Sequence, residues 1–141
     1  MKTASWILLA IVGSLTLLVS FLSAGLGYRG EYTIGPKQVK VQDVAAERAD
    51  VLEGLRGIRG TSAAYAAGYS ALFLAIVLGP YKRREVWAWW ALLAGVVLIV
   101  LVSLARIPLL GSRWGIGTSV TPAAIALIGL LLDVKRLTAK A

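Results

Sequence analysis

Four long apolar stretches make up more than half of this 141-residue chain. They cover residues 5–27, 61–80, 86–105 and 115–133, and the first contains no charged side chain. A helix needs about 20 mostly apolar residues to cross roughly 30 Å of hydrocarbon, and each stretch approaches or exceeds that length. We therefore predict an all-α membrane protein, folded as an antiparallel bundle of four transmembrane helices.

The composition leaves room for one domain. Hydrophobic residues are 58% of the chain and the mean hydropathy is +0.78, so little polar surface remains for a separate soluble domain. We predict a single four-span domain over residues 1–141. The polar residues 28–60 form an extracytoplasmic cap between the first and second spans.

The distribution of the basic residues predicts the orientation. A net charge of +8 would suit a nucleic-acid-binding protein, but many of the cations lie beside the apolar stretches. Short basic segments mark the cytoplasmic side of a membrane protein. We therefore predict a multi-pass protein of the cell membrane with both termini cytoplasmic and no nucleic-acid partner. The cations assigned to the cytoplasmic side are Lys2, Lys82, Arg83, Arg84, Lys135, Arg136 and Lys140.

Aromatic residues fit the same arrangement. Trp and Tyr collect at both surfaces of a bilayer, because their rings are apolar and their N–H or O–H groups are polar. Those assigned to the cytoplasmic surface are Trp6, Tyr81, Trp87, Trp89 and Trp90, and those assigned to the outer surface are Tyr28, Tyr32 and Trp114.

The first stretch is interpreted as a retained span. A signal-peptide cleavage site needs small residues in an A-x-A-like pair. The pair before Gly25 is Leu22 and Ala24, and the pair before Ala24 is Phe21 and Ser23, so neither fits.

The cap begins with two short runs of alternating polar and apolar residues, 31–34 and 37–41, on either side of Gly35-Pro36. This pattern indicates either a small β-hairpin or an extended loop. From Asp43 the apolar residues follow a helical period, which predicts an amphipathic helix capped by Asp43.

Three glycines, Gly54, Gly57 and Gly60, predict a bend where this surface helix turns into the second span. Small residues in that span, such as Ala63, Ala67 and Ala71, or Ala64 and Gly68, would allow close packing of helices.

In the fourth span, Pro122 is best placed in a first helical turn. Either the helix begins near Thr121 or Pro122 kinks a longer one, and we favour the later start.

The chain lacks cysteine and histidine, which excludes thiolate and imidazole metal sites and the commonest general base. None of the seven acidic residues lies within a span, since Glu85 and Asp133 fall at helix ends and the others in the cap. Buried membrane carboxylates typify proton-coupled transport, so their absence argues against such an antiporter and against an embedded hydrolase. We predict no enzymatic activity, no metal and no cofactor.

Arginines at the outer span ends are the most suggestive polar residues. A guanidinium fork binds phosphate or carboxylate well, and tyrosines on one face of the second span could line a groove below it. The alternative is that the arginines reach the headgroups and the tyrosines pack. Likewise, the run Lys82–Arg84 could bind lipid, although topology explains it. The candidate lipid- or anion-binding residues are Arg59, Tyr65, Tyr69, Arg106, Arg113 and Trp114.

A pattern over residues 55–141 supports this fold. The Gly-Ile-Arg-Gly element at 57–60 precedes an Ala/Gly/Tyr-rich helix, a basic turn and an apolar helix ending in Leu104–Arg106. A Pro/Gly loop and a final helix follow. The pattern resembles uncharacterised bacterial four-helix membrane proteins of the DoxX-like group. That resemblance implies the fold and topology, assigns no activity, and singles out Arg59 and Arg106 without a role.

We expect a small, non-enzymatic integral membrane protein that binds a partner protein or a lipid through its outer face. Two alternatives are an accessory subunit of a larger integral complex and a small oligomeric transporter or channel for anionic or hydrophobic solutes. The expected partners are membrane lipids, and either a partner membrane protein or further copies of the chain.

Overall fold

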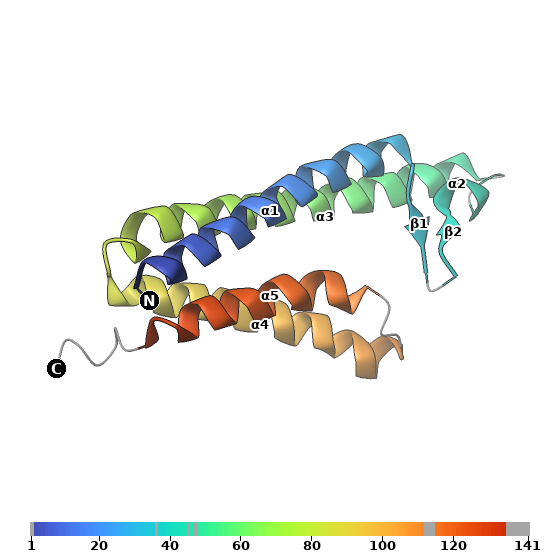
Figure 1. The fold of residues 1–141 in the computed structure, drawn as a ribbon. Coiled ribbons are helices and arrows are strands. Elements are labelled where there is room, and N and C mark those ends of the chain that lie inside the picture. The colour runs from blue at the N-terminus through green and yellow to red at the C-terminus, as the bar shows by residue number, and fades with distance from the viewer. Residues whose placement is uncertain (1, 36, 45, 47, 112–114, 135–141) are drawn as a thin grey trace. The chain divides into compact units, whose positions relative to one another are not determined.

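The computed structural model describes residues 2–35, 37–44, 46, 48–111 and 115–134, which are mostly helical (Figure 1). One two-stranded sheet accompanies the helices. The elements are α1 (Lys2–Arg29), β1 (Thr33–Ile34), β2 (Val39–Lys40), α2 (Val41–Val44), α3 (Ala49–Ile76), the π-helical turn η1 (Val77–Tyr81), α4 (Val86–Leu110) and α5 (Ile116–Leu131).

Three of the helical segments, 4–29, 49–81 and 86–109, are long and apolar enough to cross a membrane. The helix α5 is apolar but has only 16 residues, a length of about 24 Å at 1.5 Å per residue. The structure thus supports a membrane-associated helical protein. Four crossings, and the side on which each end emerges, stay predictions.

The chain divides into two compact units, which we describe separately. Unit 1 comprises residues 1–14 and 71–141, and unit 2 comprises residues 15–70. The helices α1 and α3 each contribute to both.

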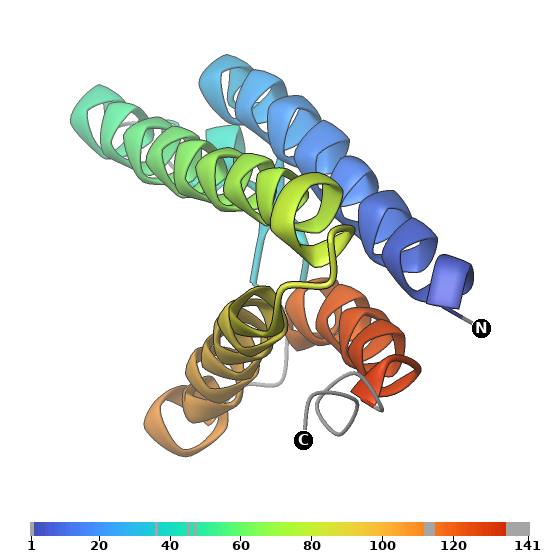
Figure 2. The ribbon, with the colours of Figure 1, turned by 90° about the vertical axis from the view of Figure 1, so that its left-hand side faces the viewer.

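The core of unit 1 is formed by the start of α1, the end of α3 with η1, and the pair α4 and α5, which lie side by side (Figure 2). Apolar side chains from these elements are buried against one another. The buried core residues are Leu9, Phe73, Val77, Tyr81, Ala88, Trp89, Leu92, Val96, Ala123, Ala126 and Leu130.

Hydrogen bonds also join these helices. The Ser5 hydroxyl donates to the Gly129 carbonyl at 2.7 Å, so the Tyr81 hydroxyl is the donor in its 2.6 Å bond to Ser5 Oγ. The Trp89 indole N–H donates to the Leu130 carbonyl at 3.0 Å. The last turn of a helix leaves carbonyls without intrahelical donors, and in hydrocarbon each is costly. The Ser5 side chain therefore provides a donor for the Gly129 carbonyl, and the Trp89 side chain gives the Leu130 carbonyl a second donor beside the Asp133 N–H. Tyr81 and Trp89, predicted at a membrane surface, are buried in unit 1.

Pro108 lies inside α4 and Pro122 lies inside α5. The third span was predicted to end at residue 105 before a Pro/Gly loop, but α4 continues through Pro108 to Leu110. Gly111 caps the helix in a left-handed conformation, and its N–H donates to the Ile107 carbonyl. The late start of the fourth helix is also wrong. The helix α5 begins at Ile116, directly after left-handed Gly115, and contains Pro122. Each proline removes one helical N–H donor, which the surrounding turns tolerate.

The helix predicted from Asp43 is found over residues 49–58, but its predicted start and its predicted bend are wrong. Asp43 lies in the four-residue α2, and α3 starts at Ala49 and runs unbroken through Gly54, Gly57 and Gly60. A glycine weakens a helix interior by about 1 kcal/mol relative to alanine, which does not break a helix held by packing.

The hairpin alternative for residues 31–41 is confirmed. The strands β1 and β2 pair antiparallel, with Thr33 opposite Lys40 and Ile34 opposite Val39. Gly35 adopts a φ of 72° at the turn, a left-handed conformation that glycine takes without steric cost.

Candidate functional site

Unit 2 brings two arginines and two tyrosines together where α1 ends. Tyr28 belongs to the last turn of α1, and Tyr32 follows just before β1. Arg56 and Arg59 lie three residues apart on α3, so their side chains leave neighbouring positions on one helical surface. We call these four residues the arginine–tyrosine cluster.

Three glycines permit the close approach of the two segments. A Cβ atom on Gly27 would lie 2.7 Å from Arg59 Cγ, and one on Gly30 would lie 2.8 Å from Arg56 Nε. On the other segment, a Cβ atom on Gly60 would lie 2.5 Å from the Tyr28 ring. Each arginine therefore packs over a glycine of the α1 end, and Tyr28 packs over a glycine of α3.

Tyr32 connects the cluster to the backbone of α3. Its hydroxyl donates a hydrogen bond of 2.8 Å to the Leu55 carbonyl. The guanidinium carbon of Arg59 lies 5.4 Å from the centroid of the Tyr32 ring, which is a cation–π contact. The Arg59 side chain is exposed.

Among the described residues, Arg56 is the one with a buried side-chain donor that makes no hydrogen bond. Its Nε atom is buried and has no hydrogen-bond partner among the described residues. The one ion pair found there joins Arg48 to Asp50, at 2.8 Å, so no described carboxylate pairs with Arg56 or Arg59. A buried donor without an acceptor costs about 1–3 kcal/mol. The cluster is therefore a place where an added oxyanion would be stabilised.

A hollow of about 270 Å³ borders the cluster. It shares Gly30 and Tyr32 with the contacts described above, and the β-hairpin supplies its far wall. Most of the surface that lines it is apolar, although the lining residues also carry hydroxyl, amide, carboxylate and ammonium groups. The lining residues are Gly30, Glu31, Tyr32, Thr33, Lys40 and Gln42.

The residues predicted from the sequence are only partly brought together. Arg59 belongs to the cluster. Tyr65 is six residues further along α3, roughly 120° around the helix from Arg59, and is 77% exposed. Unit 2 therefore does not direct Tyr65 toward Arg59. Tyr69, one turn beyond Tyr65 on α3, is half-exposed.

Arg106 lies on α4 in unit 1, where it is exposed and its Nη1 would be 3.7 Å from a Cβ atom on Gly115. Arg113 and Trp114 lie outside the described residues. The predicted convergence of Arg59 with Arg106 stays a prediction.

Sequence reasoning missed Arg56, Tyr28 and Tyr32 as site residues. The tyrosines were assigned to the outer membrane surface, and Arg56 was treated as one charge of the surface helix. A signal was present in the glycines beside them, Gly27, Gly30 and Gly60, because a glycine next to a large side chain often marks a close approach. The contacts join segments far apart in the chain, so no local period reveals them.

Among the described residues, no group of acidic side chains is arranged to hold a metal ion. The chain matches no protein-family model, and neither a curated protein nor a solved structure shows significant similarity to it. The resemblance to the DoxX-like group therefore stays an expectation. What the cluster does has to be argued from its own chemistry.

Proposed function

We propose that this protein is a non-enzymatic integral membrane protein that binds the anionic head of an amphiphile through the arginine–tyrosine cluster. The head carries an oxyanion, which is either the phosphate of a phospholipid or the carboxylate of a fatty acid. The proposed location is the cell membrane, with several crossings and both termini cytoplasmic.

The observation that carries the proposal is the buried, unpartnered Nε of Arg56 beside the unpaired Arg59. A phosphate or carboxylate accepts two parallel N–H bonds from one guanidinium, in a geometry that a lysine could not offer. One oxyanion between the two arginines would supply the missing acceptor. It would also neutralise charge in a region that lacks a described carboxylate partner.

The surroundings favour an amphiphile over a free anion. The α1 turns before the cluster expose apolar side chains, including Leu22 and Leu26, and Ile58 is exposed on α3 between the two arginines. An acyl chain would lie against such surface, as lipid tails lie along a membrane-spanning helix.

Native mass spectrometry of the full chain in mild detergent tests this proposal. The probes are phosphatidylglycerol, oleate and phosphatidylcholine, added in separate titrations. We expect the double variant Arg56→Gln/Arg59→Gln to bind the relevant anion at least about ten-fold more weakly, since a charged hydrogen bond contributes about 1.5–3 kcal/mol. Loss for phosphatidylglycerol alone identifies a lipid phosphate, and loss for oleate alone identifies a fatty-acid carboxylate.

Arg48→Gln is the matched control. Arg48 is an exposed cation of the same unit whose bond to Asp50 raises the pKa of its guanidinium, so it is charged and already paired. Its replacement should leave binding unchanged. Equal affinities of the native chain and the double variant for both anions would refute the proposed function.

The proposed orientation has its own measurement. A cysteine replacing Lys37 in the hairpin turn should react with an impermeant maleimide on intact cells, and one replacing Arg84 should react only after permeabilisation. The chain has no native cysteine, so the labelling has no background from this protein. The reverse pattern would show that the cap faces the cytoplasm.

A further inference from the structure

The connector between η1 and α4, residues 82–85, is a helix C-cap in unit 1. The Arg84 N–H bonds to the Tyr81 carbonyl at 3.0 Å, and the Glu85 N–H bonds to the Pro80 carbonyl at 3.0 Å. Arg84 itself adopts a φ of 68°. This pair of bonds around one left-handed residue is the Schellman motif, with Arg84 at its left-handed position.

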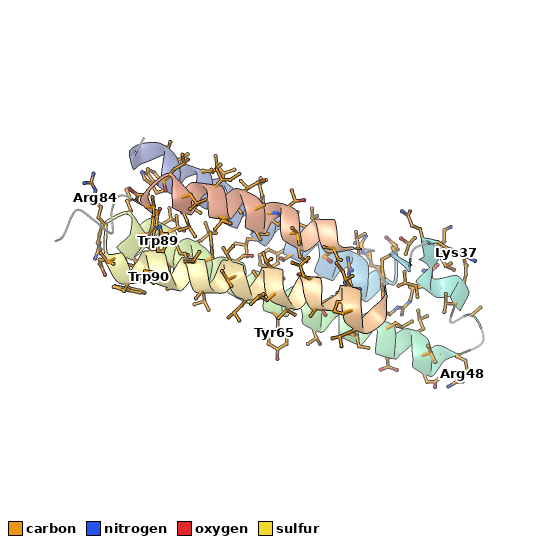
Figure 3. The ribbon with its side chains drawn as sticks, turned by 90° about the horizontal axis from the view of Figure 1, so that it is seen from below. Lys37, Arg48, Tyr65, Arg84, Trp89 and Trp90 are labelled. Atoms are coloured by element: carbon orange, nitrogen blue, oxygen red, sulfur yellow. The ribbon has the colours of Figure 1, made fainter. Side chains whose placement is uncertain are left out.

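That position ordinarily belongs to glycine. A side chain crowds the backbone in the left-handed conformation, so arginine is held there at a free-energy cost that glycine would avoid. Such strained residues collect at functional sites, where the side chain has a use that offsets the strain. The side chain of Arg84 is exposed, and in Figure 3 it projects away from the ribbon.

The two preceding residues add exposed cations to the same connector. The Nζ atom of Lys82 lies 4.8 Å from the centroid of the Trp6 ring, a cation–π contact that holds this ammonium beside α1. The neighbouring acid, Glu85, accepts a hydrogen bond from the Trp87 indole N–H. No described carboxylate pairs with Lys82, Arg83 or Arg84.

Two indoles flank the cations. Trp87 is 54% exposed and Trp90 is 55% exposed, in the first turns of α4. Exposed indoles at the end of a membrane-length helix are typical of the headgroup region. The segments 49–81 and 86–109 both have the length of membrane spans, and the connector joins them. The connector is thus expected at the depth of lipid phosphates.

We propose that this connector is a binding site for the headgroup of an anionic phospholipid. Arg83 and Arg84 would bind the phosphate, Lys82 would add charge while held on Trp6, and Trp87 and Trp90 would lie against the glycerol region. The site is separate from the arginine–tyrosine cluster of unit 2, and neither depends on the other.

The substitution Arg84→Gly tests the proposal without endangering the fold. Glycine suits the left-handed position, so the variant should melt at the same temperature or higher, while one cation is lost. We expect its affinity for phosphatidylglycerol to fall about five-fold, the effect of one basic residue at an anionic surface. Affinity for phosphatidylcholine should be unchanged. The readout is native mass spectrometry of the full chain in mild detergent.

Two further variants make the result decisive. Arg84→Lys keeps the charge and the strained backbone, so it should keep most of the preference for phosphatidylglycerol. In the Arg56→Gln/Arg59→Gln background, Arg84→Gly should still cause its own loss, which separates this site from the cluster of unit 2. Unchanged phosphatidylglycerol affinity in Arg84→Gly would overturn the proposal, and so would an equal loss for phosphatidylcholine. Either outcome would leave the proposed function of the cluster standing.

Discussion

The two units of this protein differ in how completely their interhelical polar groups are hydrogen-bonded. In unit 1, the Ser5 and Tyr81 hydroxyls and the Trp89 indole N–H all form hydrogen bonds, and two of these bonds go to carbonyls at the end of α5. In unit 2, the buried Nε of Arg56 lacks a partner among the described residues. Both units place polar atoms between helices, but among the described residues only unit 1 has an acceptor for every buried side-chain donor.

This contrast distinguishes polar groups that stabilise the fold from polar groups that could bind a ligand. Hydrogen bonds completed within the protein fix the helices of unit 1 relative to one another and offer nothing to a guest. An incomplete arginine instead lowers stability until something binds. The proposed function follows from this difference, so measurements that compare the two units test it directly.

The largest effect is expected in unit 1, from Ser5→Ala. This change removes the hydrogen bond from Ser5 to the Gly129 carbonyl and the bond between the Ser5 and Tyr81 hydroxyls, and the loss of a buried hydrogen bond costs about 1–3 kcal/mol. We expect a loss of about 2–4 kcal/mol in the free energy of unfolding, measured by denaturant titration in mild detergent.

Ser14→Ala is the matched control, because Ser14 is exposed on the same helix. It should change stability by less than about 0.5 kcal/mol. If Ser5→Ala is equally mild, the hydrogen bonds of unit 1 are not what holds its helices together.

A smaller effect is expected in unit 2, from Gly60→Ala. The new Cβ would lie 2.5 Å from the Tyr28 ring, so this ring must shift from its place over Gly60. Overpacking of this kind costs about 1–3 kcal/mol. Gly57→Ala is the control, since Gly57 is exposed with open space around it and alanine is the better helix former by about 1 kcal/mol. The two variants should therefore shift the unfolding midpoint in opposite directions. Stabilisation by both would mean that Tyr28 does not pack on Gly60.

These glycines also show how far the sequence alone could go. The apolar runs predicted the membrane-length helices because length and composition are properties of a segment by itself. Gly54, Gly57 and Gly60 were interpreted as a bend, and Pro108 and Pro122 as loop or helix-start signals, yet helices pass through all five. The free-energy cost of one lost hydrogen bond or one glycine is smaller than the stabilisation that a long apolar helix gains from packing. A rule based on single residues does not weigh these two free energies against each other.

The candidate site divides in the same way. The sequence predicted Arg59 as a site residue because an arginine at the end of an apolar stretch can be recognised from the local sequence. Its partners Tyr32 and Gly27 lie about thirty residues earlier in the chain, and their contact depends on how α1 and α3 pair. For the opposite reason, the sequence did not distinguish a hairpin from a loop in residues 31–41. The strand pairing is local, but strands of two residues are too short to show a clear alternating pattern.

The smallest expected change in stability, and the one that bears most directly on the contrast between the units, is that of Arg56→Met. Methionine keeps an apolar stem and removes the guanidinium that lies over Gly30, with its unpartnered Nε, so without ligand we expect the free energy of unfolding to rise by about 1 kcal/mol. With the bound anion the sign should reverse, because only the native chain gains stability from binding. Arg48→Met, at an exposed position, should be neutral in both conditions. A loss of more than about 1 kcal/mol from Arg56→Met in lipid-free detergent would show that Arg56 is as structural as Ser5. The unsatisfied atom would then no longer point to a ligand.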